Sequence, residues 1–351
     1  MTGISYVTDY LPGEVLDVKN YYSYLKPEIE KLPEDDRSVI TDLAPAIVHR
    51  LKDPSALEIM GLMAGQRALD ASGTDPTMID GLMTAQSGGK QFMPLIASYL
   101  QLNLGLRTGI IARNVNDGDI SFLSAVNLAR QYIKSGLCKN VLVIGSSALI
   151  GGKYGFGADL TEPWCMHLGD GAAACIVSEE DAADYEIVGF HFETEANSSR
   201  LTGTLNGDYG PIREPNNRDL CFAAEMDDKA GAYVISHDEK FIKTAGRKGF
   251  ITEILTAASE KAGLTLTDLD HIIPVHNAEL IDIWERELEE AGVKDGTVCH
   301  LQRTAGHAGG EDTFIDLARF GKEGRFKKGD VIALVVSCPG VQSAVLIIRK
   351  N

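Results

Sequence analysis

The same order of secondary-structure elements is predicted twice along this chain of 351 residues. In the first half, apolar residues recur at helical spacing between Phe122 and Ile133, and strongly apolar stretches at 141–144 and 172–177 predict buried strands. The second half repeats the pattern, with a helical stretch at about 312–321 and apolar strands at 331–336 and 344–348. The repeat distance is roughly 190 residues, so we expect an α/β fold made of two pseudo-repeated halves.

A charged run at 178–181 separates the two predicted halves. We place the N-terminal half at residues 1–182 and the C-terminal half at 183–351. Residues 19–56 mix charged and aromatic side chains without a clear period, and we expect a capping insertion there. The segment 193–221 is rich in Asn, Gly, Pro and Thr, which predicts an irregular connection near the surface or the mouth of a site.

Composition excludes several classes of function. The net charge is −17, which argues against binding to nucleic acid or to an anionic membrane, because both need basic patches on the protein. No apolar stretch approaches the ~18–20 residues that span a bilayer, and the first residues lack the pattern of a secretory signal. The six cysteines are scattered without zinc-ligand spacing. We therefore expect a reduced, cytoplasmic protein.

Several short segments, taken together and in order, carry a known pattern. They are Gly-Asp-Gly-Ala-Ala-Ala at 169–174, Pro-Val-His-Asn-Ala at 274–278, Gly306-His307 followed by Gly-Arg-Phe-Lys-Lys-Gly-Asp at 324–330, and Ser-Cys-Pro-Gly at 337–340. With this spacing, roughly residues 55–351 resemble the β-ketoacyl-[acyl carrier protein] synthase III family of the thiolase superfamily. The resemblance implies a five-layer αβαβα fold of thiolase type, with the site at the junction of the two halves.

The resemblance also implies substrates and partners. The substrate is expected to be an acyl thioester, either acyl-CoA or an acyl-carrier thioester, with no other cofactor and no metal. The chain is expected to form a homodimer, or a heterodimer with a ketosynthase homologue.

The family places its catalytic cysteine at the start of the central helix, in the pattern C-x-G-F. This chain has Asp119-Ile120-Ser121-Phe122 there. A helix start offers unpaired N–H groups and the positive end of a dipole, so an anion is stabilised at that position. Asp119 is therefore interpreted as a helix N-cap, or as a general base or orienting carboxylate for a histidine. Asp119 as the carrier of an acyl group is the least favoured role, because a stabilised carboxylate is a poor nucleophile.

Two histidines fall at positions that the resemblance makes catalytic. His276 matches the family histidine, and His307 stands where the family has Asn. In the family this pair stabilises the enolate or oxyanion of a thioester, and an imidazole N–H can still donate to an oxyanion. Gly340 matches the residue whose backbone N–H completes the oxyanion hole.

Other interpretations of the site residues stay open. Ser121 and Cys338 are alternative nucleophiles, although Ser121 is predicted to point about 200° away from Asp119 around the helix. Asp119, His276 and His307 also make up a two-histidine, one-carboxylate set that could bind a metal, which the family does not use.

Two features of the surface differ from the family. The predicted helix at 279–290 is strongly acidic, and such a face repels an acidic acyl carrier protein. Glu162 stands where the family has an arginine that holds the adenine end of coenzyme A, and Trp164 is a candidate for stacking in its place.

Three functions follow from these observations. The first is a synthase III-like acyltransferase of polyketide or fatty-acid-related metabolism that works without a cysteine acyl-enzyme. The second is a non-catalytic subunit that pairs with an active homologue. The third uses the same residues for thioester hydrolysis or decarboxylation of a malonyl-type thioester.

Overall fold

A computed structural model describes most of the chain. The described residues are 2–21, 23, 26–31, 34, 37, 44–51, 57–87, 95–149, 166–179, 183–194, 244–338 and 342–351. In this part of the chain, no helix combines the length and the apolar character needed to cross a membrane.

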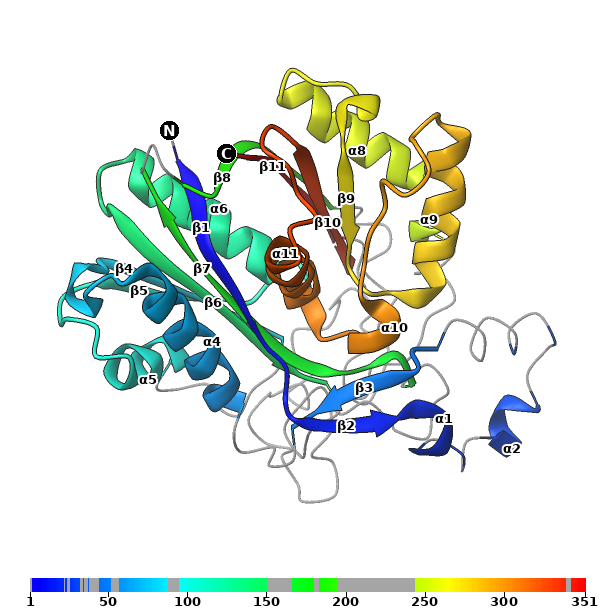
Figure 1. Cartoon of the computed structure of the whole chain (residues 1–351), viewed down its shortest axis with the longest axis horizontal. Helices are drawn as coiled ribbons and strands as arrows, with labels where there is room; N and C mark the ends of the chain where they lie inside the picture. Colours follow the sequence, from blue (N-terminus) through cyan, green and yellow to red (C-terminus); the bar gives the residue numbers. More distant parts are fainter. Residues whose placement is uncertain are drawn as a thin grey trace, which may run out of the picture.

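The first half of the main sheet contains five strands in the order β5-β4-β6-β7-β1. Their bounds are β1 Gly3–Tyr10, β4 Gly81–Ser87, β5 Ile111–Val115, β6 Asn140–Ala148 and β7 Asp170–Ser178. β4 pairs in parallel with β5 and β6, whereas β7 is antiparallel to β6 and β1. Helices α4 (Leu57–Ser72) and α5 (Ile96–Asn103) lie on the outer face of this half (Figure 1).

The second half continues the sheet in the order β8-β11-β10-β9. Its strands are β8 Tyr185–Thr194, β9 His271–Pro274, β10 Val331–Cys338 and β11 Gln342–Lys350. β9 is parallel to β10, and β11 is antiparallel to both β10 and β8. Helices α8 (Phe250–Lys261) and α9 (Ala278–Glu290) cover the outer face (Figure 1).

The two halves repeat one topology. β1, β4, β6 and β7 correspond to β8, β9, β10 and β11 in chain order and in sheet position. A parallel bridge from Ile272 to Val298 stands where β5 pairs with β4 in the first half. The predicted duplication is therefore present, and the expected boundary after residue 182 falls between β7 and β8. Residues 180–182 themselves lie outside the described part.

Two helices fill the space between the two halves of the sheet (Figure 1). They are α6 (Ser121–Lys134) and α11 (Asp312–Lys322), each of which leads into the strand that follows it, β6 or β10. The sequence explains the α6 orientation, because the residues at helical spacing from Phe122 to Ile133 are the buried ones. α11 is buried on nearly all sides, and its buried residues include two aspartates, Asp312 and Asp316. The layers are thus α4/α5, sheet, α6/α11, sheet and α8/α9, as expected for the five-layer αβαβα fold.

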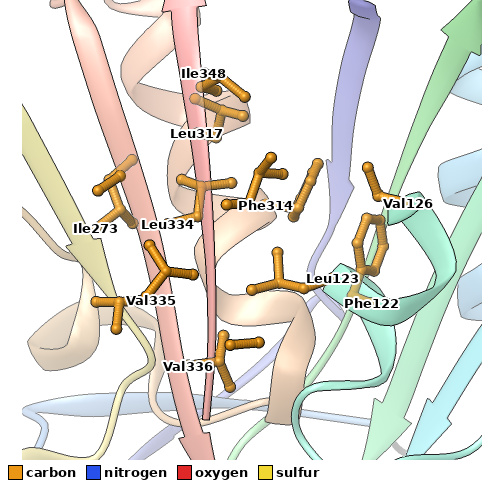
Figure 2. Close-up of a cluster of buried hydrophobic side chains, with 14 of the residues drawn as sticks. Phe122, Leu123, Val126, Ile273, Phe314, Leu317, Leu334, Val335, Val336 and Ile348 are labelled. Carbon is orange, nitrogen blue, oxygen red and sulfur yellow. The ribbon is translucent and has the colours of Figure 1, made fainter. Parts of the chain in front are cut away.

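The core holds the two central helices together. Phe122 of α6 and Phe314 of α11 pack with ring centroids 4.2 Å apart. Figure 2 shows these rings beside Leu334 of β10 and Ile348 of β11. β7 and β10 are buried along their whole length, because helices cover both faces of the sheet. This packing fixes the positions of the first residues of α6 and α11.

A small antiparallel sheet pairs a strand just before the stretch expected to be an insertion, residues 19–56, with a strand inside that stretch. It pairs β2 (Glu14–Asp17) with β3 (Ile47–Arg50), and short helices α1 (Val18–Tyr21) and α2 (Lys26–Ile29) lie between them in the chain. Val48 of β3 packs so closely on Gly306 that a Cβ there would come within 2.7 Å of the Val48 side chain. β3 therefore covers the segment that leads to His307.

Gly310 shows how tightly the two helix starts approach each other. A Cβ at residue 310 would overlap the backbone carbonyl of Asp119. A side chain at residue 310 would therefore push the start of α11 away from the start of α6.

We expect the substitution Gly310→Ala to destabilise the protein by about 1–3 kcal/mol, the range for overpacking of a filled core. Urea unfolding followed by circular dichroism measures this change. Gly13→Ala is the matched control, because a Cβ at residue 13 meets no atom within 4 Å. Equal stability of G310A and G13A would contradict the close approach.

Candidate active site

Asp119 lies immediately before α6, on the side of that helix start that faces α11. The residue at the N-cap position is Ile120, and no side chain caps the helix. The geometry therefore does not show the helix-capping role that the sequence suggested for Asp119. Its side chain is 17% exposed, and its Oδ2 lies 3.9 Å from Nε2 of His307. Asp119 and His307, which are far apart in the sequence, are thus brought together.

His307 is held firmly from both its backbone and its ring. Its backbone N–H donates to the His167 carbonyl, and its own carbonyl accepts from the Gly169 N–H, both at 2.7 Å. The ring Nδ1 lies 2.6 Å from Oδ2 of Asp312. A carboxylate accepts, so Nδ1 carries the proton, and the neutral ring presents the Nε2 lone pair toward Asp119. The Gly-Asp-Gly turn thereby positions the His307 backbone, while Asp312 fixes its tautomer.

Asp312 is the centre of a buried polar network. Its carboxylate accepts from the backbone N–H groups of His276, at 3.0 Å, and Ala308, at 2.7 Å, in addition to His307 Nδ1. Burial acts to raise the pKa of Asp312, but the His276 and His307 rings and these hydrogen bonds hold it below its usual value. Asp312 is therefore a stable anion that orients His307.

His276 lies behind Asp312 and away from solvent. Its side chain is fully buried, its Nδ1 donates to the Gly306 carbonyl at 2.7 Å, and its Nε2 lies 2.7 Å from Oδ2 of Asp316. Burial acts to lower the pKa of His276, but Asp316 and Asp312 more than offset this and raise it to about 9. Since both ring nitrogens contact protein groups, the expectation that His276 polarises a substrate does not fit this geometry. His276 supports the network that orients His307.

Asp119 and His307, the two partly exposed groups of the site, have shifted pKa values. Burial raises the pKa of Asp119, the His307 ring opposes this, and the charge of Asp312 adds to the rise. Burial acts to lower the pKa of His307, but the charge and hydrogen bond of Asp312 outweigh this, so its pKa is raised. Asp119 and His307 therefore both take up protons more readily than isolated side chains do, and groups with shifted pKa values are candidates for proton transfer.

A further carboxyl group, that of Glu311, lies under the site. Its side chain is 1% exposed, and its Oε2 accepts a 2.7 Å hydrogen bond from Ser147 at the end of β6. Its Oε1 would lie 2.7 Å from a Cβ at Gly145, so only glycine leaves room for it there. Burial raises the pKa of Glu311 to about 8, against the hydrogen bond from Ser147. At neutral pH Glu311 is therefore mostly a neutral acid.

Asp312, Asp316 and Glu311 were not among the site residues predicted from the sequence. A signal was present, because Asp312 and Asp316 stand four residues apart on one face of a predicted helix, with apolar residues between and after them. Buried acids on a core helix require partners, and the two histidines at family positions were available.

The alternative nucleophiles are both occupied. Ser121 is buried, accepts from the Asp117 N–H at 2.7 Å and donates to the Gly118 carbonyl. The Cys338 sulfur accepts from the backbone N–H groups of Asp119 and Ile120, yet burial raises the pKa of the thiol to about 12. Cys338 is thus a neutral thiol with 3% exposure, which is unfavourable for nucleophilic attack.

Several sequence predictions fall on other parts of the chain. Gly340, Glu162 and Trp164 lie outside the described residues. Within the described part, no group of three or more His, Cys, Asp or Glu side chains has metal-binding geometry. The acidic helix predicted at 279–290 is α9, and its Glu287 caps the start of α8 by accepting from the N–H groups of Gly249 and Thr252.

The raised pKa of Glu311 predicts a pH-dependent loss of stability. A carboxyl that titrates near 4.5 when unfolded and near 8 when folded binds its proton more tightly in the folded state. The stabilisation that comes from this proton is fully present below about pH 4.5 and is lost as the pH rises from there toward about 8. Thermal unfolding of wild type and Glu311→Gln from pH 5 to 8 should show Tm falling more steeply in wild type. Parallel curves would contradict a buried neutral Glu311.

Comparisons with known proteins agree with the resemblance seen in the sequence. The family model for 3-oxoacyl-[acyl-carrier-protein (ACP)] synthase III matches residues 114–196. The β-ketoacyl-[acyl-carrier-protein] synthase III of Coxiella burnetii (strain Dugway 5J108-111) is 28% identical over 281 residues, which cover 80% of each protein. That of Caldanaerobacter subterraneus subsp. tengcongensis is 25% identical over 353 residues, or 99% of this chain and 97% of that protein.

Solved structures agree in fold over nearly the whole chain. The 3-oxoacyl-[acyl-carrier-protein] synthase III from Aquifex aeolicus VF5 has a TM-score of 0.78 and 22% identity, covering 99% of this chain and 100% of that one. OleA from Xanthomonas campestris, with bound lauric acid and lauroyl-CoA, has a TM-score of 0.80 and 16% identity, covering 99% and 98%. These structures show the thiolase-type fold, and the sequence matches support a relationship to the synthase III family.

Proposed function

We propose that this chain is a synthase III-like acyltransferase that acts on an acyl thioester by acid–base chemistry of Asp119 and His307, without a cysteine acyl-enzyme. One observation carries the proposal: Asp312 holds the Nδ1 proton of His307, so that Nε2 faces Asp119 across 3.9 Å. This gap exceeds a hydrogen bond. An acceptor group placed between the two would contact both.

The roles of the residues follow from their positions. His307 and Asp119 take a proton from the acceptor, and Asp312 stabilises the imidazolium that forms, as the orienting acid does in a Ser-His-Asp triad. His276 and Asp316 keep Asp312 in place from behind. The thioester carbonyl oxygen is assigned to the backbone N–H of Gly340, on the resemblance alone. After attack on the carbonyl carbon, the C–S bond breaks and the thiolate takes the proton from His307.

The likeness to β-ketoacyl synthases III supports the substrate class, since these proteins are named for acyl-carrier thioester chemistry. Among the cysteines that the structure describes, Cys338 is a poor candidate to carry an acyl group, because its thiol is buried with a raised pKa. A covalent acyl-aspartate at Asp119 is disfavoured, because such an anhydride is very labile. The expected metabolic setting is polyketide or fatty-acid-related synthesis.

The substitution His307→Ala should reduce kcat at least about a hundredfold, the usual size of a general-base contribution. Thiol release from acetyl-, butyryl- and lauroyl-CoA measures the rate. His271→Gln is the matched control, because His271 lies at the opposite end of β9 from His276 and pairs with Asp330 at 3.1 Å.

Asp312→Asn tests the orienting role separately. Removing the Asp312 charge lowers the pKa of His307, so the rise of kcat with pH should move to lower pH. An unchanged rate in H307A would discard acid–base catalysis by His307, whereas the absence of thiol release by the wild type would leave the non-catalytic subunit. Release of free acid without an acceptor would instead identify a thioester hydrolase.

A further inference from the structure

The charges around the proposed site are unevenly balanced. Four carboxyl groups and two imidazoles make up the network, namely Asp119, Glu311, Asp312, Asp316, His276 and His307. The His276 ring faces Asp316, and the His307 ring faces Asp312. Among the described residues, Asp119 has only the His307 ring as an ion-pair neighbour, and it shares that ring with Asp312.

In the part of the chain that the structure describes, basic side chains do not correct this balance. Within the described residues, every ion pair of these six groups joins a histidine to an aspartate, and none involves Lys or Arg. Burial raises the pKa of Asp316, and the neighbouring aspartates raise that of His276, so these two share a proton as a pair without net charge. With one proton on the Asp119–His307 pair and a neutral Glu311, the negative charge of Asp312 is then left without compensation. Loss of the proton from the Asp119–His307 pair adds a second negative charge. An incoming group therefore meets a negative site.

The negative charge is presented where an acceptor would enter. The side chains of Asp119 and His307 are 17% and 15% exposed, whereas those of Asp312, Asp316 and His276 are at most 1% exposed. The Asp119 carboxylate does not cap α6, so its oxygens remain available to accept hydrogen bonds from a ligand. An ammonium group has N–H donors and the opposite charge, which such a carboxylate favours.

We propose that the acceptor is a primary amine that enters as an ammonium ion between Asp119 and His307, and that the product is an amide. This inference rests on the acyltransferase function proposed above. A malonyl-type acceptor carries a carboxylate, which Asp119 and Asp312 would repel. A neutral alcohol fits the gap but gains nothing from the negative charge. The charge of the site therefore favours an amine acceptor over an alcohol.

The reaction balances without any further reactant. The ammonium loses one proton to the Asp119–His307 pair, which releases a proton to solvent, and the nitrogen lone pair then forms a bond to the thioester carbonyl carbon. The C–S bond breaks with its electron pair on sulfur, and the second amine proton passes through His307 to the thiolate. The products are an amide, a free thiol and the proton released to solvent.

A competition among acceptors tests the proposal. The full-length protein is incubated with acetyl-, butyryl- or lauroyl-CoA and, in turn, n-butylamine, n-butanol, malonyl-CoA or buffer alone, with products identified by mass spectrometry. We expect N-butyl amide to exceed butyl ester at least tenfold. In Asp119→Asn, which keeps the shape but removes the charge, the KM for butylamine should rise at least tenfold, and H271Q should behave as wild type. Ester or carbon–carbon products without amide would overturn the amine assignment and leave acyl transfer intact.

A binding measurement decides the inference even without turnover. Isothermal titration with n-butylammonium chloride and with sodium butyrate compares the two charges on one carbon chain. We expect binding of the ammonium by wild type and its loss in D119N, with circular dichroism confirming that the variant is folded. Tighter binding of butyrate, or ammonium binding that D119N does not change, would overturn the inference. If no acceptor gives thiol release but the ammonium still binds in an Asp119-dependent way, the proposed acyltransferase function is rejected and the ammonium site stands.

Discussion

The buried carboxylate of Asp312 connects the parts of this site. It accepts hydrogen bonds from the backbone of His276 and Ala308 and from the ring of His307. An anion in that position is stable only because two imidazoles and the start of α11 compensate its charge. In turn, it decides which nitrogen of His307 faces Asp119. The orientation of the partly exposed His307 ring toward Asp119 is therefore set by a residue that is itself buried, Asp312.

The duplicated fold supplies the frame for this arrangement. α6 and α11 occupy equivalent places in the two halves and pack through Phe122 and Phe314, so their first turns approach each other closely. Glycine at 145 and 310 removes the side chains that would keep the helix starts apart. Side chains placed on such packed elements are held in fixed geometry, which the proposed acid–base chemistry requires.

Sequence patterns were sufficient to predict the five-layer fold and the proximity of Asp119 to His307. The spacing from Phe122 to Ile133 gave the buried face of α6, and the ordered motifs gave the fold. The sequence patterns did not reveal that both ring nitrogens of His276 contact protein groups. These contacts are with Asp316 and the Gly306 carbonyl, which only tertiary packing brings near the ring. Gly340 stays a prediction, as it lies outside the described residues.

The state of the His307 ring tests the central claim most directly. Nitrogen-15 NMR of histidine-labelled protein, with His307 assigned from the H307A spectrum, reports both its tautomer and its pKa. We expect a neutral ring protonated at Nδ1, with a pKa above the ordinary 6.5 that falls in the variant Asp312→Asn. A neutral ring protonated at Nε2, or a pKa that D312N leaves unchanged, would show that Asp312 does not orient His307.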